Sequence, residues 1–326
     1  MSRARRVLGL TGGTCALVML MLCGWLWALQ REVPGTNTPA VVAHRGGSGA
    51  APQNSLAAVS WAAERGLGVE LDVVLSADGV PMLSHDPWLV RETCGRVETP
   101  TSPLDEVVLV HEQTAAALQR DFRCGGIEDP TYEGEPATAG GASVPRLAEA
   151  LALLPERAEL FLDLKILDGV TAGAERFAEA IVPLIAGRAG RVWLEVPRDA
   201  HVRALREAGI RGPQRKVLMS WPAFTPSVQD TSATWSRLGL RTLLATDLRL
   251  INPIAKAREA GADGIVSLRP VLSPSTAERV RDAGLAVVWF VGADTMQGQK
   301  DAVAALCAGP GDLLILDYAD RLFCEG

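Results

Sequence analysis

Residues 40–75 of the chain read AVVAHRGGSGAAPQNSLAAVSWAAERGLGVELDVVL, and their pattern indicates the fold class. It holds two short apolar runs, Ala40–Ala43 and Gly68–Leu75, with the length and composition of buried strands. Between them, SLAAVSWAAERG at residues 55–66 has a helical pattern and ends in glycine, the expected helix stop. This order of strand, helix and strand predicts two parallel strands joined by a crossover helix.

The same alternation continues to the C-terminus. Residues 40–326 suit a (β/α)8 TIM barrel, and a doubly wound open sheet is the main alternative. The glycine-rich dinucleotide fingerprint is absent after the first strand. More apolar runs occur than the eight strands that a barrel needs, and Thr242–Ala245 fits least well. The candidate strands are Ala40–Ala43, Gly68–Leu75, Glu159–Leu164, Val192–Val196, Lys216–Ser220, Thr242–Ala245, Gly264–Leu268, Ala286–Val291 and Leu313–Leu316.

One connection departs from the alternation. Gly68–Leu75 and Val80–Ser84 are separated only by the sequence SADG, which is too short for a crossover and has a turn composition. We therefore expect an antiparallel hairpin at this point. Residues 87–145 then show no clean periodicity, and they predict a small subdomain inserted into the barrel.

The N-terminal region is a separate object. Residues 1–6 carry three arginines and predict a cytoplasmic tail, whereas residues 7–29 carry no charge. A helix of this apolar stretch would be roughly 34 Å long, enough to cross a bilayer. We predict an uncleaved transmembrane signal anchor at 7–29, a linker at 30–39 and an exported barrel at 40–326, in the periplasm or outside the cell. A cleaved signal, which would leave a secreted protein, is the alternative.

Cysteine usage agrees with export. Two of the six cysteines, Cys15 and Cys23, lie in the apolar segment, and the other four allow two disulfides in an oxidising compartment. We expect Cys94–Cys124 and Cys307–Cys324 because each pair closes a local loop. The other two connectivities, and four buried free thiols, are the alternatives.

Composition excludes one class of partner. The chain is 48% hydrophobic and 21% charged, which is ordinary for a globular protein, and its formal net charge is −6. Since no basic stripe accompanies this acidic balance, nucleic acid is not an expected partner.

Titratable residues gather where predicted strands end, which is where barrels of this class carry their active sites. Side chains two apart on a strand share a face, so Glu70 and Asp72 point the same way, as do Asp163 and Lys165. Each signal alone is also typical of a structural ion pair or a solvated face, and only their common position favours a site. The seven candidates are His44, Arg45, Glu70, Asp72, His85, Asp163 and Lys165.

These residue types point to phosphate chemistry. Three converging carboxylates repel one another unless a cation neutralises them, and hard oxygen ligands favour Mg²⁺ or Ca²⁺. Two histidines beside such a metal are candidates for general acid and base, because the ordinary pKa of imidazole lies near working pH. Arg45 and Lys165 are suited to hold an anionic substrate such as a phosphate.

The hairpin is expected to bring His85 to a carboxylate. A turn centred on residues 77–78 places His85 opposite Glu70, and a turn centred on residues 78–79 places it opposite Asp72. Both registers stay open in the sequence.

Three other residues have a simpler interpretation. His111 and His201 lie in helical patterns and are interpreted as solvated helix residues. Trp289, on the apolar run AVVWFVG, is either a core residue or a wall of the ligand site.

Residues 43–93 resemble the signature of the glycerophosphodiester phosphodiesterase family. The shared features are an HRG turn, a PEN-type turn, an E-x-D pair, a DG hairpin and a following HD. Later segments also resemble the family, namely SVPRLAEALALL, FLDLK, GADGIVSLRP, AGLAVVWFVG and GDLLILDYADRL. The resemblance spans about residues 40–320, and its first block is the most specific.

This resemblance implies a (β/α)8 barrel with an inserted subdomain, one divalent cation, Ca²⁺ or Mg²⁺, and phosphodiester hydrolysis by two histidines. Carried over by motif, the roles fall on Glu70, Asp72 and Asp163 as metal ligands, His44 and His85 as the catalytic pair, Arg45 and Lys165 as phosphate ligands, and Trp289 as a pocket wall.

The chain also departs from the family pattern. The glutamate of the PEN turn is Gln53 here, and the third metal ligand, usually glutamate, is Asp163. An aspartate at this place is similar to the sphingomyelinase D-like phospholipase D group. The strand that ends WTVN in the family reads Trp-Phe-Val-Gly at residues 289–292. These departures leave the substrate open.

The leading hypothesis is a metal-dependent enzyme that hydrolyses glycerophosphodiesters to glycerol-3-phosphate and an alcohol. The membrane anchor makes a lipid phosphodiester as reasonable a substrate as a small soluble one. A sphingomyelinase D-like or lysophospholipid phosphodiesterase is the second hypothesis. A catalytically silent exported binding module, with residues 87–145 as its contact surface, is the third.

Overall fold

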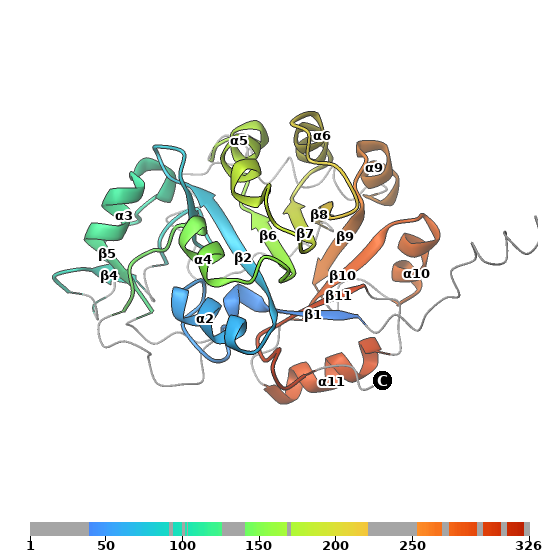
Figure 1. The fold of residues 1–326 in the computed structure, drawn as a ribbon, viewed down its shortest axis with the longest axis horizontal. Helices are drawn as coiled ribbons and strands as arrows, with labels where there is room; N and C mark the ends of the chain where they lie inside the picture. The colour runs from blue at the N-terminus through green and yellow to red at the C-terminus, as the bar shows by residue number, and fades with distance from the viewer. Residues whose placement is uncertain are drawn as a thin grey trace, which may run out of the picture. The chain divides into compact units, whose positions relative to one another are not determined.

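The computed structural model describes residues 39–90, 94–99, 102, 104–125, 141–167, 171–220, 253–268, 274–291, 296–307 and 312–322. Within them, eight parallel strands close into a barrel (Figure 1). They are β1 (Ala40–Ala43), β2 (Gly68–Leu75), β6 (Leu160–Leu164), β7 (Val192–Val196), β8 (Arg215–Ser220), β9 (Gly264–Leu268), β10 (Ala286–Phe290) and β11 (Leu313–Leu316).

The ring closes because β1 pairs with β11 on one side and with β2 on the other. This closure confirms the predicted barrel over the open sheet. The strand order also resolves the surplus of candidate strands, since β8 pairs directly with β9 through Leu218 and Gly264. The ring is therefore complete without Thr242–Ala245, which lies outside the described residues.

Helices cover the outer side of the strands (Figure 1). In the part of the chain that the structure describes, they are α2 (Leu56–Glu64), α4 (Leu147–Leu153), α5 (Ala174–Ile185), α6 (Asp199–Glu207), α9 (Pro253–Ala260), α10 (Pro274–Asp282) and α11 (Met296–Cys307). Among these described helices, none is both long and apolar enough to cross a membrane. The predicted anchor at 7–29 lies outside the described residues.

Period-two alternation sorts the strand side chains into two apolar clusters. The larger cluster lies between strands and helices, and it contains Trp289 of β10 together with helix residues such as Phe177. The smaller cluster fills the barrel interior and is built from strand residues. Its buried members are Val42, Phe161, Trp193, Leu218, Val266, Val288, Leu313 and Ile315.

This arrangement corrects two expectations. Trp289 packs in the outer cluster with 2% of its surface exposed, so it is a core residue and not a wall of the ligand site. Its neighbour Phe290 takes the inward position, because successive strand residues point to opposite faces. His201 on α6 was expected to be solvated, but it is 7% exposed, whereas His111 is half-buried.

The predicted hairpin is confirmed, but both expected registers are wrong. β3 (Pro81–Leu83) runs antiparallel to β2, with Leu83 opposite Val73. The amide of Ser76 donates to the carbonyl of Val80 (3.0 Å), so the loop holds three residues and ends on Gly79, which has a φ of 78°. An odd loop shifts the pairing by one residue relative to either two-residue turn.

The shift moves a serine to the position expected for His85. The amide of Ser84 donates to the carbonyl of Asp72 at 3.2 Å, which marks these two residues as partners across the hairpin. His85 therefore lies one residue beyond the pairing, in the segment that follows β3.

The insertion between β3 and α4 has its own small core. It contains β4 (Cys94–Arg96), a turn of 3-10 helix at Val110–Glu112, α3 (Ala115–Asp121) and β5 (Phe122–Cys124). Residues of the insertion and of the neighbouring hairpin bury a separate cluster, which includes Val74, Met82, Leu89, Cys94, Leu104, Val108, Val110, Ala115, Leu118, Phe122 and Val144. The predicted inserted subdomain is thus present.

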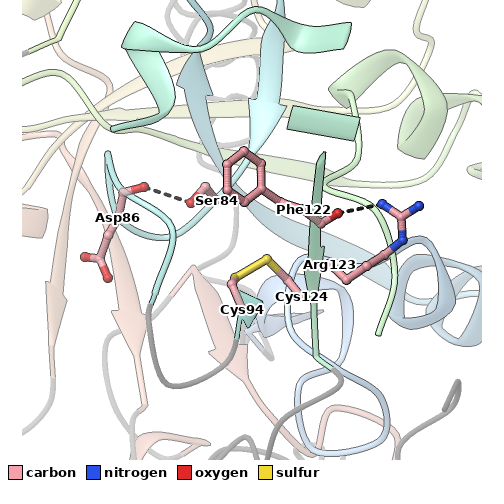
Figure 2. Close-up of a disulfide and its surroundings, with 6 residues drawn as sticks. All are labelled: Ser84, Asp86, Cys94, Phe122, Arg123 and Cys124. Atoms are coloured by element: carbon pink, nitrogen blue, oxygen red, sulfur yellow. Dashed lines mark hydrogen bonds between the residues drawn. A yellow bond between two sulfur atoms is a disulfide. The ribbon is translucent and has the colours of Figure 1, made fainter. Parts of the chain in front are cut away.

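A disulfide joins Cys94 to Cys124, as predicted (Figure 2). The two cysteines are directly opposite each other in the antiparallel pair β4–β5. Figure 2 also places Ser84 and Asp86 close by, on the segment that carries His85, and Ser84 Oγ donates to the carbonyl of Asp86 at 2.8 Å. The other predicted pair includes Cys324, which lies outside the described residues.

Candidate active site

A pocket of about 270 Å³ lies at the carboxyl ends of the strands. All seven polar residues predicted for the site line it. The structure therefore brings together side chains that are up to 121 positions apart in the sequence. The lining residues are His44, Arg45, Glu70, Asp72, His85, Asp163, Lys165, Glu195, Ser220, Val266, Ser267, Phe290 and Ile315.

His44 begins the turn His44–Gly46 directly after β1 and is buried, with 6% of its surface exposed. Its Nδ1 lies 2.6 Å from Oδ1 of Asp317, and its Nε2 lies 3.9 Å from Oε2 of Glu70. The ring of Phe290 meets the imidazole edge to face, with 4.4 Å between the centroids. Burial and the charge of Arg45 lower the pKa of His44, although Asp317 acts in the opposite direction.

Arg45 contacts two neighbouring carboxylates by different means. Its φ of 50° is in the left-handed region, which turns its backbone amide toward Glu70 Oε2 at 2.7 Å. Its guanidinium Nε lies 3.4 Å from Asp72 Oδ2, while Nη1 donates to Oε1 of Gln53. Gln53, which stands where the family has a glutamate, therefore accepts a hydrogen bond from Arg45 without adding a negative charge.

The turn that carries Arg45 is tightly packed on α2. Gly47 has a φ of 121°, and a Cβ atom at this position would lie 2.6 Å from the ring of Trp61. Only glycine satisfies both the backbone conformation and the close approach. The close packing of this glycine turn on α2 thus fixes the positions of His44 and Arg45 directly after β1.

Asp72 is the most strongly paired carboxylate of the pocket. Lys165 Nζ lies 2.7 Å from its Oδ1, and Asn54 Nδ2 donates to its Oδ2 at 2.7 Å. Burial alone would raise the pKa of Asp72, but the charges of Lys165, His85 and Arg45 hold it well below its usual range. Asp72 is therefore ionised at every working pH.

Glu70 and Glu195 have the opposite behaviour. Burial raises the pKa of Glu70 well above its usual value, and the charge of Asp72 adds to this effect. Burial and the charge of Asp163 raise the pKa of Glu195 to about 8, against a hydrogen bond from Ser220 Oγ at 2.7 Å. Burial and neighbouring carboxylates thus favour the protonated form of both glutamates.

Lys165 bridges two acidic side chains. Its Nζ lies 2.6 Å from Asp163 Oδ2 as well as 2.7 Å from Asp72 Oδ1. Burial would lower the pKa of Lys165, but these two carboxylates raise it above its usual value. The ammonium is therefore a permanent charge of the pocket.

His85 is the most accessible of the predicted site residues. Its side chain is 38% exposed, and its Nδ1 lies 3.2 Å from Oδ1 of Asp86. Because His85 lies beyond the hairpin pairing, it reaches the pocket from the segment that directly follows β3, where the inserted subdomain begins. Its imidazole can exchange protons with solvent, which the buried His44 cannot do as readily.

Several residues that hold this network were not predicted, among them Asp317, Glu195, Asn54 and Gln299, whose side-chain amide donates to Asp317. Asp317 and Glu195 satisfy the rule that singled out the others, since Asp317 directly follows β11 and Glu195 lies near the end of β7. Asn54 and Gln299 have no comparable signal, because an amide in a turn or at a helix start is common. Asn54 has a φ of 54°, and this conformation lets its side chain bond both the amide and the carboxylate of Asp72.

The donor set fits a hard divalent cation. Four carboxylates, from Glu70, Asp72, Asp163 and Glu195, face a pocket whose permanent positive charges are those of Arg45 and Lys165. Carboxylate oxygens are the ligands that Mg²⁺ and Ca²⁺ prefer, and burial with neighbouring carboxylates raises the pKa of both glutamates, an effect that a bound cation would oppose. Among the described residues, no three acidic, histidine or cysteine side chains already lie in a metal-binding group.

Known proteins share this fold. An Oleispira antarctica phosphodiesterase, solved in complex with the product sn-glycerol-3-phosphate, aligns with a TM-score of 0.60 over 87% of this chain and 95% of its own, at 20% identity. The glycerophosphodiester phosphodiesterase of Agrobacterium tumefaciens aligns with a TM-score of 0.57 at 23% identity, over 86% of this chain and 97% of its own. At this identity the likeness establishes the barrel.

Curated sequences match over shorter stretches. Glycerophosphodiester phosphodiesterase 1 of Bos taurus is 40% identical over 82 residues, which is 25% of each chain. An uncharacterised protein of Mycobacterium tuberculosis is 31% identical over 155 residues, or 47% of this chain and 44% of its own. The chain thus spans from about a quarter to under a half of the length of these two relatives.

A family model covers most of the chain. The model of the glycerophosphoryl diester phosphodiesterase family matches residues 44–317, from the histidine after β1 to the aspartate after β11. Its limits coincide with the pocket residue His44 and with Asp317, whose Oδ1 lies 2.6 Å from Nδ1 of that histidine. The chain belongs to the glycerophosphoryl diester phosphodiesterase family.

Proposed function

We propose that this chain hydrolyses glycerophosphodiesters to glycerol-3-phosphate and an alcohol, with one hard divalent cation and with His44 and His85 as base and acid. One observation carries the proposal. Two imidazoles, two permanent cations and four carboxylates line a single pocket at the end of the barrel where this fold places its chemistry. The family to which the chain belongs supports the same reaction class.

His44 is suited to act as the base. Its lowered pKa leaves the imidazole neutral at pH 7, and its Nε2 is on the side of Glu70, inside the pocket. As oxygen attacks phosphorus, His44 accepts the proton of the attacking water or of a neighbouring glycerol hydroxyl. If the glycerol hydroxyl attacks first, a cyclic phosphate forms and water then opens it.

His85 is suited to act as the acid. The bond between phosphorus and the ester oxygen of the alcohol breaks, and His85 donates a proton to that leaving oxygen. The partly exposed ring then regains a proton from solvent, while His44 loses one, so the two histidines return to their starting states. This division of roles agrees with the buried position of one ring and the accessible position of the other.

The remaining residues hold charge in place. Arg45 and Lys165 supply positive charge beside the phosphoryl oxygens, and Glu70, Asp72 and Asp163 would hold the cation. When bound, such a cation polarises the phosphodiester and neutralises charge on its oxygens. Product identity is supported by the Oleispira antarctica phosphodiesterase, whose solved complex contains sn-glycerol-3-phosphate.

We also propose that the barrel works outside the cytoplasm, anchored by residues 7–29. The uncharged stretch of sequence and the three arginines before it support this orientation. The Cys94–Cys124 disulfide supports it independently, because such bonds persist in oxidising compartments. Protease added to spheroplasts, whose outer membrane has been opened, should digest the barrel, and protection of the barrel in them would refute the orientation.

The direct test uses the purified full-length chain. We expect release of glycerol-3-phosphate from glycerophosphoethanolamine with Ca²⁺ or Mg²⁺, and none with chelator. Equal release with chelator would refute the metal dependence. Hydrolysis of a lysophospholipid without hydrolysis of the deacylated substrate would instead support a sphingomyelinase D-like specificity, and failure on both substrates would support a silent barrel.

A further inference from the structure

Asp317 follows β11 and is held by a network that the proposed reaction has not yet used. It is 7% exposed, and its Oδ1 lies 2.6 Å from Nδ1 of His44. The hydroxyl of Ser48 donates to the same oxygen, and the side-chain amide of Gln299 donates to Oδ2. Both oxygens of one carboxylate are therefore engaged, by three side chains from two segments, the turn after β1 and α11.

Gln299 has an orientation that its backbone partners fix. The residue is fully buried on α11, and its Nε2 donates to the carbonyl of Val291 at 2.9 Å. Its Oε1 accepts from the amides of Asp317 (3.1 Å) and Tyr318 (3.3 Å). A carbonyl can only accept and an amide can only donate, so the nitrogen and the oxygen of this side chain cannot exchange places. The second hydrogen of Nε2 must then point at Oδ2 of Asp317.

The consequence reaches His44. An ionised Asp317 has only acceptors, and its Oδ1 faces Nδ1 of His44. The pKa of Asp317 is lowered although burial acts against this, because His44 and Ser48 hydrogen-bond its ionised form. A neutral His44 must place its hydrogen on Nδ1, which leaves the lone pair on Nε2, the atom on the side of Glu70.

We infer that Asp317, oriented by Gln299, is a positioning residue that holds neutral His44 in the tautomer whose Nε2 can accept a proton in the pocket. The inference rests on the proposed function, since it assigns a task to the base of that reaction. Asp317 itself does not line the pocket, so it acts through His44.

The variant Asp317→Asn separates positioning from simple support of the fold. Because Gln299 still donates toward the Oδ2 position, the new amide must place its oxygen there and its nitrogen at the Oδ1 position. That nitrogen donates to Nδ1 of His44 and forces the hydrogen onto Nε2, the wrong atom for a base. We expect kcat to fall by about 10²–10⁴-fold, the range for general acid–base catalysis, with KM and melting temperature little changed.

Two measurements on the full-length chain decide the matter. In the first, kcat is compared among Asp317→Asn, His44→Ala and the double variant. If Asp317 acts only through His44, the double variant is no slower than His44→Ala, whereas two independent losses that multiply would overturn the inference. Asp320→Asn is the matched control, because this aspartate is close in sequence and forms an ion pair with the neighbouring Arg321.

In the second, ¹⁵N-histidine NMR at pH 8 reads the tautomer directly, without substrate. The chain has four histidines, and loss of one signal in His44→Ala assigns the resonance. Protonated Nδ1 in the wild type and protonated Nε2 in Asp317→Asn are expected. Protonated Nε2 in the wild type would overturn the inference even if the variant fails to fold. An inactive wild type with protonated Nδ1 would refute the proposed function alone.

Discussion

The two halves of the barrel interior differ in chemistry although they come from the same strands and the same face. Phe161, Trp193 and Leu218 belong to the apolar interior cluster. Two residues further along each strand, the side chains are Asp163, Glu195 and Ser220, and all three line the pocket. A spacing of two residues along each strand thus separates a layer of side chains that stabilises the barrel from a layer whose side chains can take part in catalysis. We refer to these as the apolar layer and the polar layer.

The contrast between the two layers explains how the site is supported. Buried charges cost free energy unless they are paired and hydrogen-bonded. The polar layer lies on a close-packed apolar interior, which cannot rearrange to lower this cost. The two layers should therefore respond differently to substitution. Changes in the polar layer should affect catalysis, and changes in the apolar layer should affect stability.

The largest effect is expected from the histidines of the polar layer. His44→Ala and His85→Ala should each lower kcat by about 10²–10⁴-fold, because each removes a proton-transfer group. Steady-state kinetics on glycerophosphoethanolamine, with melting temperatures measured in parallel, provide the check. His111→Ala is the control, since this histidine lies outside the pocket. Full activity of His85→Ala beside an inactive His44→Ala would refute the two-histidine scheme.

The apolar layer should show the opposite response. Phe161 is fully buried, and Phe161→Ala should lower the free energy of unfolding by about 3–5 kcal/mol through lost burial and a cavity. Urea unfolding measures this loss, and activity corrected for the folded fraction should stay within a few-fold of the wild type. Phe161→Leu should cost less. A large catalytic loss in a fully folded Phe161→Leu protein would show that the two layers are not separable.

The pH dependence of stability should depend on Glu195. Its folded pKa of about 8 exceeds its usual value of 4.5, so the folded state keeps a proton that the unfolded state loses between these values. The free energy of unfolding contributed by this group is therefore fully present below pH 4.5 and is lost as pH rises through 8. In chelator, Glu195→Gln should have a flatter curve of melting temperature against pH than the wild type. Parallel curves would contradict the assignment.

A smaller effect is expected from cation binding. At a concentration 100 times its Kd, a cation that binds only the folded state adds about 2.7 kcal/mol to the free energy of unfolding. Ca²⁺ or Mg²⁺ should thus raise the melting temperature of the wild type at pH 8, and less so in Glu70→Gln. Thermal unfolding with and without chelator measures both. An equal rise in the two proteins would place the cation elsewhere.

The barrel strands and most polar residues of the pocket are predictable from the sequence, whereas several details are not, for physical reasons. Apolar runs identified all eight barrel strands, because a strand buried on both faces is apolar throughout. Period two shows that neighbours point to opposite faces, but it does not say which one points inward. The residues themselves therefore left open whether Trp289 faces the core or the pocket, and the pocket position belongs to its neighbour Phe290.

Two other errors have local causes. The hairpin register depends on a three-residue loop ending at Gly79, and a glycine after aspartate is equally compatible with a two-residue turn. Asp317 and Glu195 obeyed the strand-end rule but were not selected, because no second titratable residue marked them in the sequence. The carboxylate pair and the histidines were selected because their signals coincide.

The inserted subdomain leaves and rejoins the barrel at one place. Met82 of β3 bridges to Arg146, and the amide of Leu83 donates to the carbonyl of Pro145 at 2.9 Å. The cost of closing a loop whose ends already meet grows only slowly with its length. The inserted subdomain can therefore be exchanged, shortened or extended without disturbing the barrel. The exception is the short segment directly after β3, which places His85 in the pocket.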